Sequence, residues 1–151
     1  MQLKSLKDTQ NLSNKISKII STGDIIFLYG EVGVGKTTFV RFLINHLEAE
    51  NGIKKSDVLS PTFNIVYDYD LGKIKIHHYD LYRIKNYEDI LELGMFDILE
   101  DHIKIIEWPE LIKSKPKDRI DIFFQYSKSI DSRKVKINGL GKWKDYKFDE
   151  V

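Results

Sequence analysis

The sequence predicts one three-layer α/β domain over residues 1–151, with a central parallel sheet and antiparallel additions. Segments typical of strands and of helices alternate along the chain, which favours the α/β class. The runs at 24–29 and 102–108 are continuously apolar, as in strands covered on both faces. A chain of 151 residues with 42% apolar side chains suffices for one core. We therefore expect a single folded domain.

The first third of the chain reads as a helix, a buried strand and a second helix. Residues 8–20 (DTQNLSNKISKII) have apolar side chains at helical spacing, with Asp8 or Thr9 as the expected N-cap. The run DIIFLY at 24–29 predicts a central strand, and FVRFLINHLEA at 39–49 predicts an amphipathic helix. A glycine-rich loop joins these last two elements.

The rest of the chain predicts two hairpins that flank a helix and a second buried strand. One hairpin turns at Gly72, and the strand HIKIIEW is stopped by Pro109. The expected elements are strands at 64–71 and 73–81, a helix at 87–99, a strand at 102–108, and strands at 119–126 and 133–139. The tail beyond them is rich in lysine and contains Trp143.

Charge and composition exclude several classes of protein. The chain has 24 Lys+Arg against 23 Asp+Glu, so its global charge does not indicate a dedicated nucleic-acid or membrane-surface binder. There is no cysteine, the first residues lack the apolar core of a secretory signal, and no apolar run is long enough to cross a bilayer. We expect a soluble cytoplasmic protein.

The loop between the first buried strand and the following helix carries a phosphate-binding motif. GEVGVGKTT at 30–38 matches G-x-x-x-x-G-K-[ST], with Gly30, Gly35, Lys36 and Thr37 in the fixed places. Its position after a strand and before a helix is the one this motif requires. The sequence therefore predicts the P-loop NTPase fold and a bound nucleoside triphosphate.

Each residue type in the loop suits that ligand. Gly33 and Gly35 allow backbone N–H groups to close on phosphate oxygens, and Lys36 supplies a positive charge for the β and γ phosphates. The Thr37 hydroxyl is suited to Mg²⁺. A magnesium site of this kind also uses a carboxylate at the end of a neighbouring strand, and both Glu107 and Asp80 are candidates.

Five segments together resemble one family. GEVGVGKTT, SPTFNIVYDY, HHYDLYR, ELG and IIEWPE, in this order, are similar to the motifs of the TsaE family, also called YjeE. The resemblance runs from about Thr9 to Arg133. It implies an ATPase that works with the TsaD and TsaB proteins to make threonylcarbamoyladenosine in tRNA. On this interpretation the chain meets tRNA only indirectly, through that complex.

The resemblance also implies roles for individual residues. It makes Thr37 and Glu107 the Mg²⁺ ligands and Asp80 the catalytic residue needed for hydrolysis, and it places Thr62 in a segment like the first switch of small GTPases. The residues it implies for nucleotide binding are Thr9, Gly33, Val34, Gly35, Lys36, Thr37, Thr38 and Arg133.

Several side chains have two interpretations. His77 and His78 are adjacent on a strand, so they point to opposite faces and packing is favoured over a shared metal. Arg83 either clamps the segment around Asp80 or approaches the phosphates. The lysines at 113–117 form a solvated loop or contact tRNA phosphates.

The two tryptophans carry a further expectation. Trp108 is either core or a reporter of the nucleotide beside Glu107, whereas Trp143 is expected in the tail, away from the ligand.

Two other functions remain as alternatives. A small-molecule P-loop kinase needs an acceptor pocket and usually an arginine-rich lid, but the four arginines are scattered along the chain. A guanine-nucleotide switch of the small GTPase type carries an N-K-x-D motif, which does not occur after residue 107. An ATPase that is slow alone and stimulated by partner proteins is the favoured function.

Overall fold

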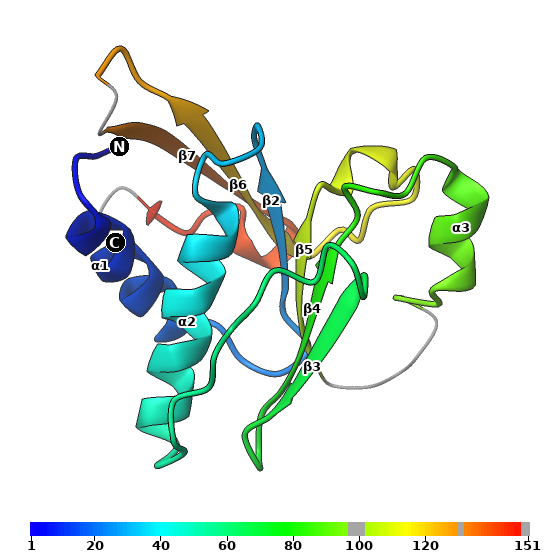
Figure 1. The fold of residues 1–151 in the computed structure, drawn as a ribbon, viewed down its shortest axis with the longest axis horizontal. Helices are drawn as coiled ribbons and strands as arrows, with labels where there is room; N and C mark the ends of the chain where they lie inside the picture. Colours follow the sequence, from blue (N-terminus) through cyan, green and yellow to red (C-terminus); the bar gives the residue numbers. More distant parts are fainter. Residues whose placement is uncertain (97–101, 130–131, 149–151) are drawn as a thin grey trace.

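The computed structural model describes residues 1–96, 102–129 and 132–148, and within them the strands form one sheet of seven. The strand order is β1-β7-β6-β2-β5-β4-β3 (Figure 1). The strands are β1 (Gln2–Leu3), β2 (Ile25–Tyr29), β3 (Val66–Asp70), β4 (Lys75–Asp80), β5 (Ile103–Glu107), β6 (Arg119–Tyr126) and β7 (Arg133–Leu140).

The centre of the sheet is parallel and its edges are antiparallel. β4, β5, β2 and β6 run in the same direction, and β3, β7 and β1 are added antiparallel to their neighbours. The predicted parallel sheet with antiparallel additions is therefore confirmed. In the parallel part, Glu107 pairs with Asp80 on one side and with Leu28 on the other. The two candidate carboxylates thus share one edge of the sheet.

The two faces of the sheet are covered differently, which gives the three layers. The helices and short 3₁₀ helices are α1 (Leu6–Ser17), α2 (Lys36–Glu50), α3 (Tyr87–Glu92), η1 (Pro109–Leu111) and η2 (Gly141–Trp143). α1 and α2 lie side by side against one face, and α3 lies on the opposite side of the sheet (Figure 1). The core on the side of α1 and α2 is the larger one.

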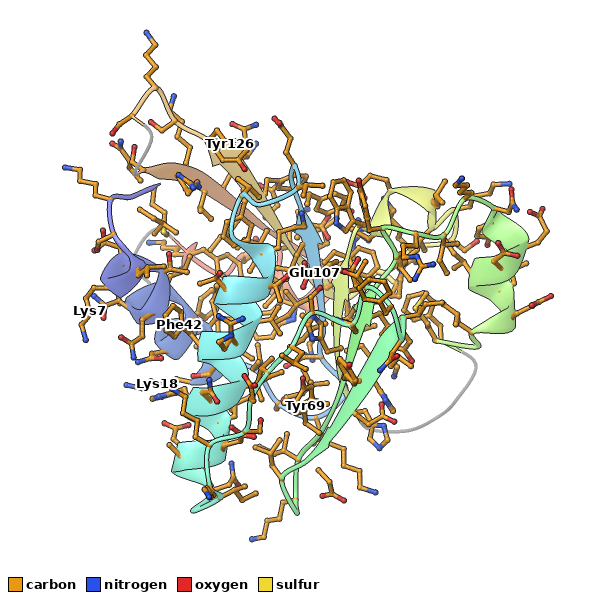
Figure 2. The ribbon with its side chains drawn as sticks, in the orientation of Figure 1. Lys7, Lys18, Phe42, Tyr69, Glu107 and Tyr126 are labelled. Atoms are coloured by element: carbon orange, nitrogen blue, oxygen red, sulfur yellow. The ribbon has the colours of Figure 1, made fainter. Side chains whose placement is uncertain are left out.

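The apolar runs are continuous because both faces are buried. On β2, Ile26 and Leu28 pack in the large core beneath α1 and α2, whereas Phe27 packs in the smaller core with Ile90 of α3. Side chains alternate between the two faces of a strand, so a strand covered on both faces has apolar residues throughout. The many side chains of Figure 2 fill the space on both sides of this sheet.

The start of α1 differs from the expected one. The N-cap is Ser5, whose hydroxyl accepts a hydrogen bond of 3.2 Å from the Asp8 N–H. The Asp8 carboxylate in turn accepts from the Lys4 N–H at 2.8 Å. The prediction of Asp8 or Thr9 as the cap is therefore wrong, because Asp8 serves as the reciprocal acceptor one turn further along.

Other boundaries also shift. α3 ends at Glu92, followed by Gly94 with φ of 55°, so the helix is shorter than the predicted 87–99, of which 97–99 lie outside the described residues. β1 was not predicted; it has two residues and pairs with β7. Trp143, expected in the lysine-rich tail, is 9% exposed and packs against Tyr146 and Phe148, so this part of the tail is folded against the core.

In the described part of the chain, no helix is both long and apolar enough to cross a bilayer.

Candidate active site

The phosphate-binding loop joins β2 to α2 through glycines in unusual conformations. Gly30, Gly33 and Gly35 have φ of 136°, 73° and 115°, values that residues other than glycine rarely adopt. A Cβ atom on Gly30 would also lie 2.4 Å from the carbonyl oxygen of Phe124. The loop can therefore approach β6 closely and end at Gly35, the N-cap of α2. Helix N-termini favour anions.

Lys36 is buried at the start of α2 with its ammonium held by the loop. Its Nζ donates to the carbonyl oxygens of Gly30 at 2.6 Å and Glu31 at 3.0 Å, and lies 4.0 Å from the centre of the Trp108 ring. Desolvation by burial lowers the pKa of Lys36, although nearby carboxylates such as Glu107 oppose the shift. The site thus contains a poorly hydrated cation.

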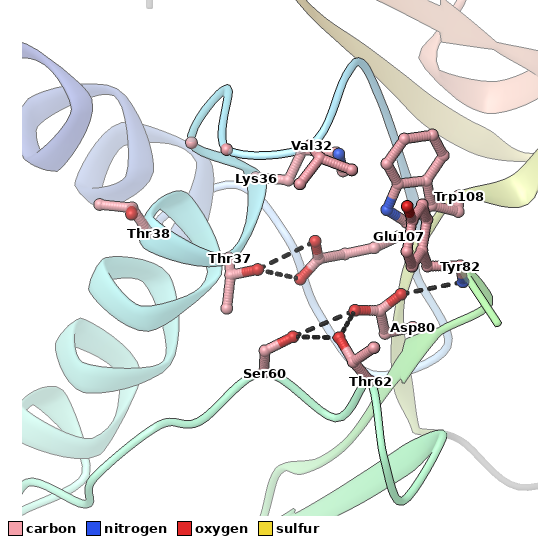
Figure 3. A pocket seen from close by; sticks show the side chains of 12 residues that line it. Val32, Lys36, Thr37, Thr38, Ser60, Thr62, Asp80, Tyr82, Glu107 and Trp108 are labelled. Atoms are coloured by element: carbon pink, nitrogen blue, oxygen red, sulfur yellow. Dashed lines mark hydrogen bonds between the residues drawn. The ribbon is translucent and has the colours of Figure 1, made fainter.

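Thr37 and Glu107 meet across the end of the sheet. The Thr37 Oγ1 donates to the Glu107 carboxylate, with distances of 3.0 Å to Oε1 and 3.1 Å to Oε2 (Figure 3). Glu107 is the last residue of β5 and is 2% exposed, and Thr37 lies in the first turn of α2. Oε1 of Glu107 also accepts a hydrogen bond from Nε2 of His78 at 2.9 Å.

Asp80, at the end of β4, is bound to a different segment. Its Oδ2 accepts from the hydroxyls of Thr62 at 2.5 Å and Ser60 at 3.1 Å, and its Oδ1 accepts from the Tyr82 N–H at 3.0 Å (Figure 3). The SPTF segment is therefore tied to the strand end beside Glu107. Of the two candidate carboxylates, Glu107 is the one that contacts Thr37.

These groups surround one pocket of about 300 Å³. The SPTF segment, the strand ends and Trp108 face the phosphate loop across it (Figure 3). Its described lining contains Val32, Gly33, Gly35, Lys36, Thr37, Thr38, Ser60, Thr62, Asp80, Tyr82, Glu107 and Trp108. Hydroxyl, carboxylate and ammonium groups converge here, but none of these lining residues is an arginine.

A second pocket of about 250 Å³ adjoins the same loop. Thr9 of α1 and Arg133 of β7 both line it. These are the two residues, at either end of the matching region, that the family resemblance implies for nucleotide binding. Gly33, Gly35 and Thr38 line this pocket and the first one. The structure thus brings the sequence-predicted site residues together around the two pockets, with Val34 in the second.

Two side chains from the β6–β7 hairpin hold the phosphate loop, and one of them was not predicted. The Tyr126 hydroxyl donates to the carbonyl oxygen of Val32 at 2.7 Å, and Nε of Arg133 donates to that of Val34 at 3.1 Å. The Arg133 guanidinium lies 4.8 Å from the centre of the Tyr126 ring. Tyr126 and Val32 are 94 residues apart, so no local pattern reveals this contact.

The structure also separates the alternatives for other side chains. His77 and His78 do point to opposite faces: His78 bonds Glu107, and Nδ1 of His77 lies 2.5 Å from Oδ1 of Asp68. Arg83 is exposed and lies 5.3 Å from the Phe63 ring, and it does not line the first pocket.

In the 113–117 loop, two lysines contact aromatic rings. Nζ of Lys113 lies 4.5 Å from the Tyr87 ring centre, and Nζ of Lys115 donates to the Tyr29 hydroxyl at 3.2 Å. Contact of this loop with tRNA stays a prediction.

Comparison with known proteins gives consistent matches over most of the chain. Residues 3–135 match the family model described as threonylcarbamoyl adenosine biosynthesis protein TsaE. A Rickettsia prowazekii protein named tRNA threonylcarbamoyladenosine biosynthesis protein TsaE is 40% identical over 111 residues, which are 74% of each chain. The Borreliella burgdorferi protein of the same name is 38% identical over 143 residues, 92% of this chain and 98% of its own length.

The fold also matches a solved structure. The crystal structure of Bacillus subtilis YdiB superimposes with a TM-score of 0.73 and 22% identity, covering 99% of this chain and 90% of the other. At this identity the match shows a common fold.

Proposed function

Because the chain belongs to the TsaE family of threonylcarbamoyladenosine biosynthesis proteins, we propose that it is an ATPase that supports a TsaD and TsaB transferase complex. The single observation that carries this proposal is the convergence of Lys36, Thr37, Glu107 and Asp80 around one pocket. In the proposal Lys36 binds phosphate, Thr37 and Glu107 coordinate the metal, and Asp80 acts on the attacking water. The chain reaches tRNA through the complex, in keeping with its formal charge of +1.

The second pocket supplies a place for the rest of the nucleotide. In the proposal, residues 33–38 bind the phosphates, while Thr9 and Arg133 line the neighbouring pocket where the base and ribose lie. Because Gly33, Gly35 and Thr38 belong to both linings, one molecule can occupy both pockets. This supports a nucleotide rather than an isolated phosphate as the ligand.

The residues present fit a Mg²⁺ ion. Thr37 and Glu107 supply hard oxygen donors beside the helix N-terminus, and Mg²⁺ in such sites is held by one or two protein oxygens with phosphates and waters. The described residues contain no group of three His, Cys, Asp or Glu side chains that could hold a metal alone. We therefore assign Thr37 and Glu107 as the residues that would hold the ion, which would supply positive charge against the phosphates.

Asp80 is proposed to act on the attacking water. It is 3% exposed, and its carboxylate already accepts hydrogen bonds from Ser60 and Thr62, so its orientation is fixed. A carboxylate held across the pocket from Lys36 can orient water toward the terminal phosphate. The hydrogen bond from Thr62 to Asp80 supports the further proposal that Thr62 responds to that phosphate as a switch residue does.

The lining of the first pocket suggests why a partner is needed. All four arginines are engaged elsewhere: Arg41 with the Val58 carbonyl, Arg83 with Phe63, Arg119 with Asp121 and Arg133 with the Val34 carbonyl. In phosphate-loop enzymes an arginine supplied to the transition state accelerates hydrolysis by about 10³- to 10⁵-fold. We propose that the chain alone turns over slowly and that the TsaD–TsaB complex completes the site.

The test is steady-state phosphate release with and without TsaD and TsaB. The parent should be slow alone and stimulated by the partners, whereas Asp80→Ala should bind ATP normally and lose the stimulation. Asp145 is an exposed aspartate that does not line the pocket, so Asp145→Ala is the matched control and should behave like the parent. Rapid hydrolysis by the isolated chain, unchanged by the partners, would rule out the accessory mechanism. Normal stimulation of Asp80→Ala would remove only Asp80 from it.

A further inference from the structure

A histidine lies behind the proposed metal ligand, outside the pocket. His78 is on β4, two residues before Asp80, and its side chain is fully buried at 0% exposure. It does not line the first pocket, whereas Glu107 does. Its Nε2 is 2.9 Å from Oε1 of Glu107, which is the same oxygen that Thr37 contacts at 3.0 Å. His78 therefore reaches the carboxylate from the core side.

The surroundings of the imidazole fix which nitrogen donates. Nδ1 of His78 is buried and has no hydrogen-bond partner among the residues that the structure describes. A hydrogen on Nδ1 would be a buried donor without an acceptor, which is strongly unfavourable. A hydrogen on Nε2 instead meets the carboxylate oxygen of Glu107. The structure thus favours the tautomer that donates to Glu107.

The hydrogen bond from His78 restricts the orientation of the Glu107 carboxylate, which is the proposed metal ligand. β4 carries Ile76 and His78 on the face that packs beneath α2, and Ile76 is in the apolar core. A histidine buried at a position that would suit an apolar residue loses its hydration on folding, and His78 regains one hydrogen bond, to Glu107. Carboxylates that bind metals are themselves held by outer hydrogen bonds of this kind.

We propose that His78 is a positioning residue for the metal site: its Nε2–H holds the Glu107 carboxylate in the orientation that, together with Thr37, binds Mg²⁺. The inference rests on the proposed function, which assigns Glu107 to the ion. The neighbouring residue provides the control. His77 is next to it on the same strand, faces the other side of the sheet and bonds Asp68 instead of Glu107.

The experiment measures Mn²⁺ binding by electron paramagnetic resonance, with protein saturated by a non-hydrolysable ATP analogue. His78→Leu removes the donor and keeps an apolar side chain of similar size, and it should weaken Mn²⁺ binding by about 10- to 100-fold. His78→Gln places an amide donor near the position of Nε2 and should retain most of the affinity. His77→Leu should bind Mn²⁺ like the parent.

Glu107→Gln separates failure of this inference from failure of the proposed function. If Glu107→Gln loses Mn²⁺ affinity while folded His78→Leu keeps it, the positioning role is wrong and the metal assignment stands. If Glu107→Gln binds Mn²⁺ like the parent, the metal assignment fails and the role of His78 fails with it.

A second pair of variants keeps the test decisive if His78→Leu does not fold. His78→Asn has an amide too short to reach Glu107, so it should lose Mn²⁺ affinity, whereas His78→Gln should not. Equal affinity in the Asn and Gln variants would overturn the inference. Thermal unfolding without metal shows that each variant is folded and measures any purely structural role separately.

Discussion

The two pockets that meet at the phosphate loop are built in different ways. The first is lined by the loop, the SPTF segment and the ends of β4 and β5, and each of these belongs to a short motif. The second combines Leu3 and Thr9 from the start of the chain with Phe124 and Arg133 from near its end. The first pocket carries Asp80 and Glu107 at strand ends and Lys36 at the start of α2, whereas the second depends on β1 and α1 meeting β6 and β7. This difference predicts that mutations in the two pockets will affect different parts of the nucleotide.

The largest effect is expected from Lys36→Ala in the first pocket. It removes a charged donor to phosphate, which predicts a loss in affinity of about 100-fold for both ATP and inorganic triphosphate. Calorimetry with each ligand measures this loss, and thermal unfolding checks the fold. Lys115→Ala is the control, because Lys115 bonds Tyr29 and does not line either pocket. Unchanged affinity in a folded Lys36→Ala protein would remove the basis of the site.

A smaller and more selective effect is expected from Arg133→Ala in the second pocket. Affinity for ATP should fall by about tenfold, the worth of one hydrogen bond to a charged group, while affinity for inorganic triphosphate should fall less. The adjacent Lys134 is exposed and on the other face of β7, so Lys134→Ala provides the matched control. An equal loss for both ligands would mean that Arg133 acts only through the loop carbonyl of Val34.

Tyr126→Phe tests the contact that links the β6–β7 hairpin to the first pocket. Removing the hydroxyl leaves the Val32 carbonyl without this donor, and a single neutral hydrogen bond is worth about 1 kcal/mol, or about fivefold in affinity. Because the change acts on the phosphate loop, ATP and inorganic triphosphate should be affected alike. Identical affinities in the parent and the variant would show that the loop keeps its shape without the hairpin.

The smallest change is a spectroscopic one. Trp108 lines the first pocket beneath Nζ of Lys36, so Mg-ATP should alter its fluorescence, and Trp108→Phe should abolish the signal. Trp143 packs with Tyr146 and Phe148 and lines neither pocket, so Trp143→Phe should keep the signal. A full fluorescence change in Trp108→Phe would reverse this assignment. The affinity of Trp143→Phe for Mg-ATP is expected to change little.

The same comparison explains which features the sequence could predict. The loop at 30–38 and the acids Asp80 and Glu107 stand at the ends of apolar strands, and parallel strands bring their carboxyl ends to one edge. Local pattern therefore sufficed to predict that these two acids lie at one edge of the sheet. The opposite orientations of His77 and His78 could also be predicted from the local sequence, because adjacent residues on a strand face opposite sides of the sheet.

The features that were missed depend on contacts between distant residues. β1 is too short to give a periodic pattern, and it is stabilised by pairing with Arg133 and Lys134 of β7, near the other end of the chain. The Tyr126 contact with Val32 and the packing of Trp143 likewise require knowledge of the folded chain. The Ser5 cap was missed because Asp8 and Ser5 both suit the start of a helix, and only the geometry separates them.

Lys36 illustrates how the ligand-free fold prepares for an anion. The residue is 4% exposed, and its ammonium contacts two neutral carbonyl oxygens and the face of Trp108. Most of the dehydration that phosphate binding requires has therefore already taken place during folding. These contacts do not fully replace the lost hydration, and desolvation therefore lowers the pKa of Lys36. A bound triphosphate relieves it, so the chain should unfold at a markedly higher temperature with its ligand than without it.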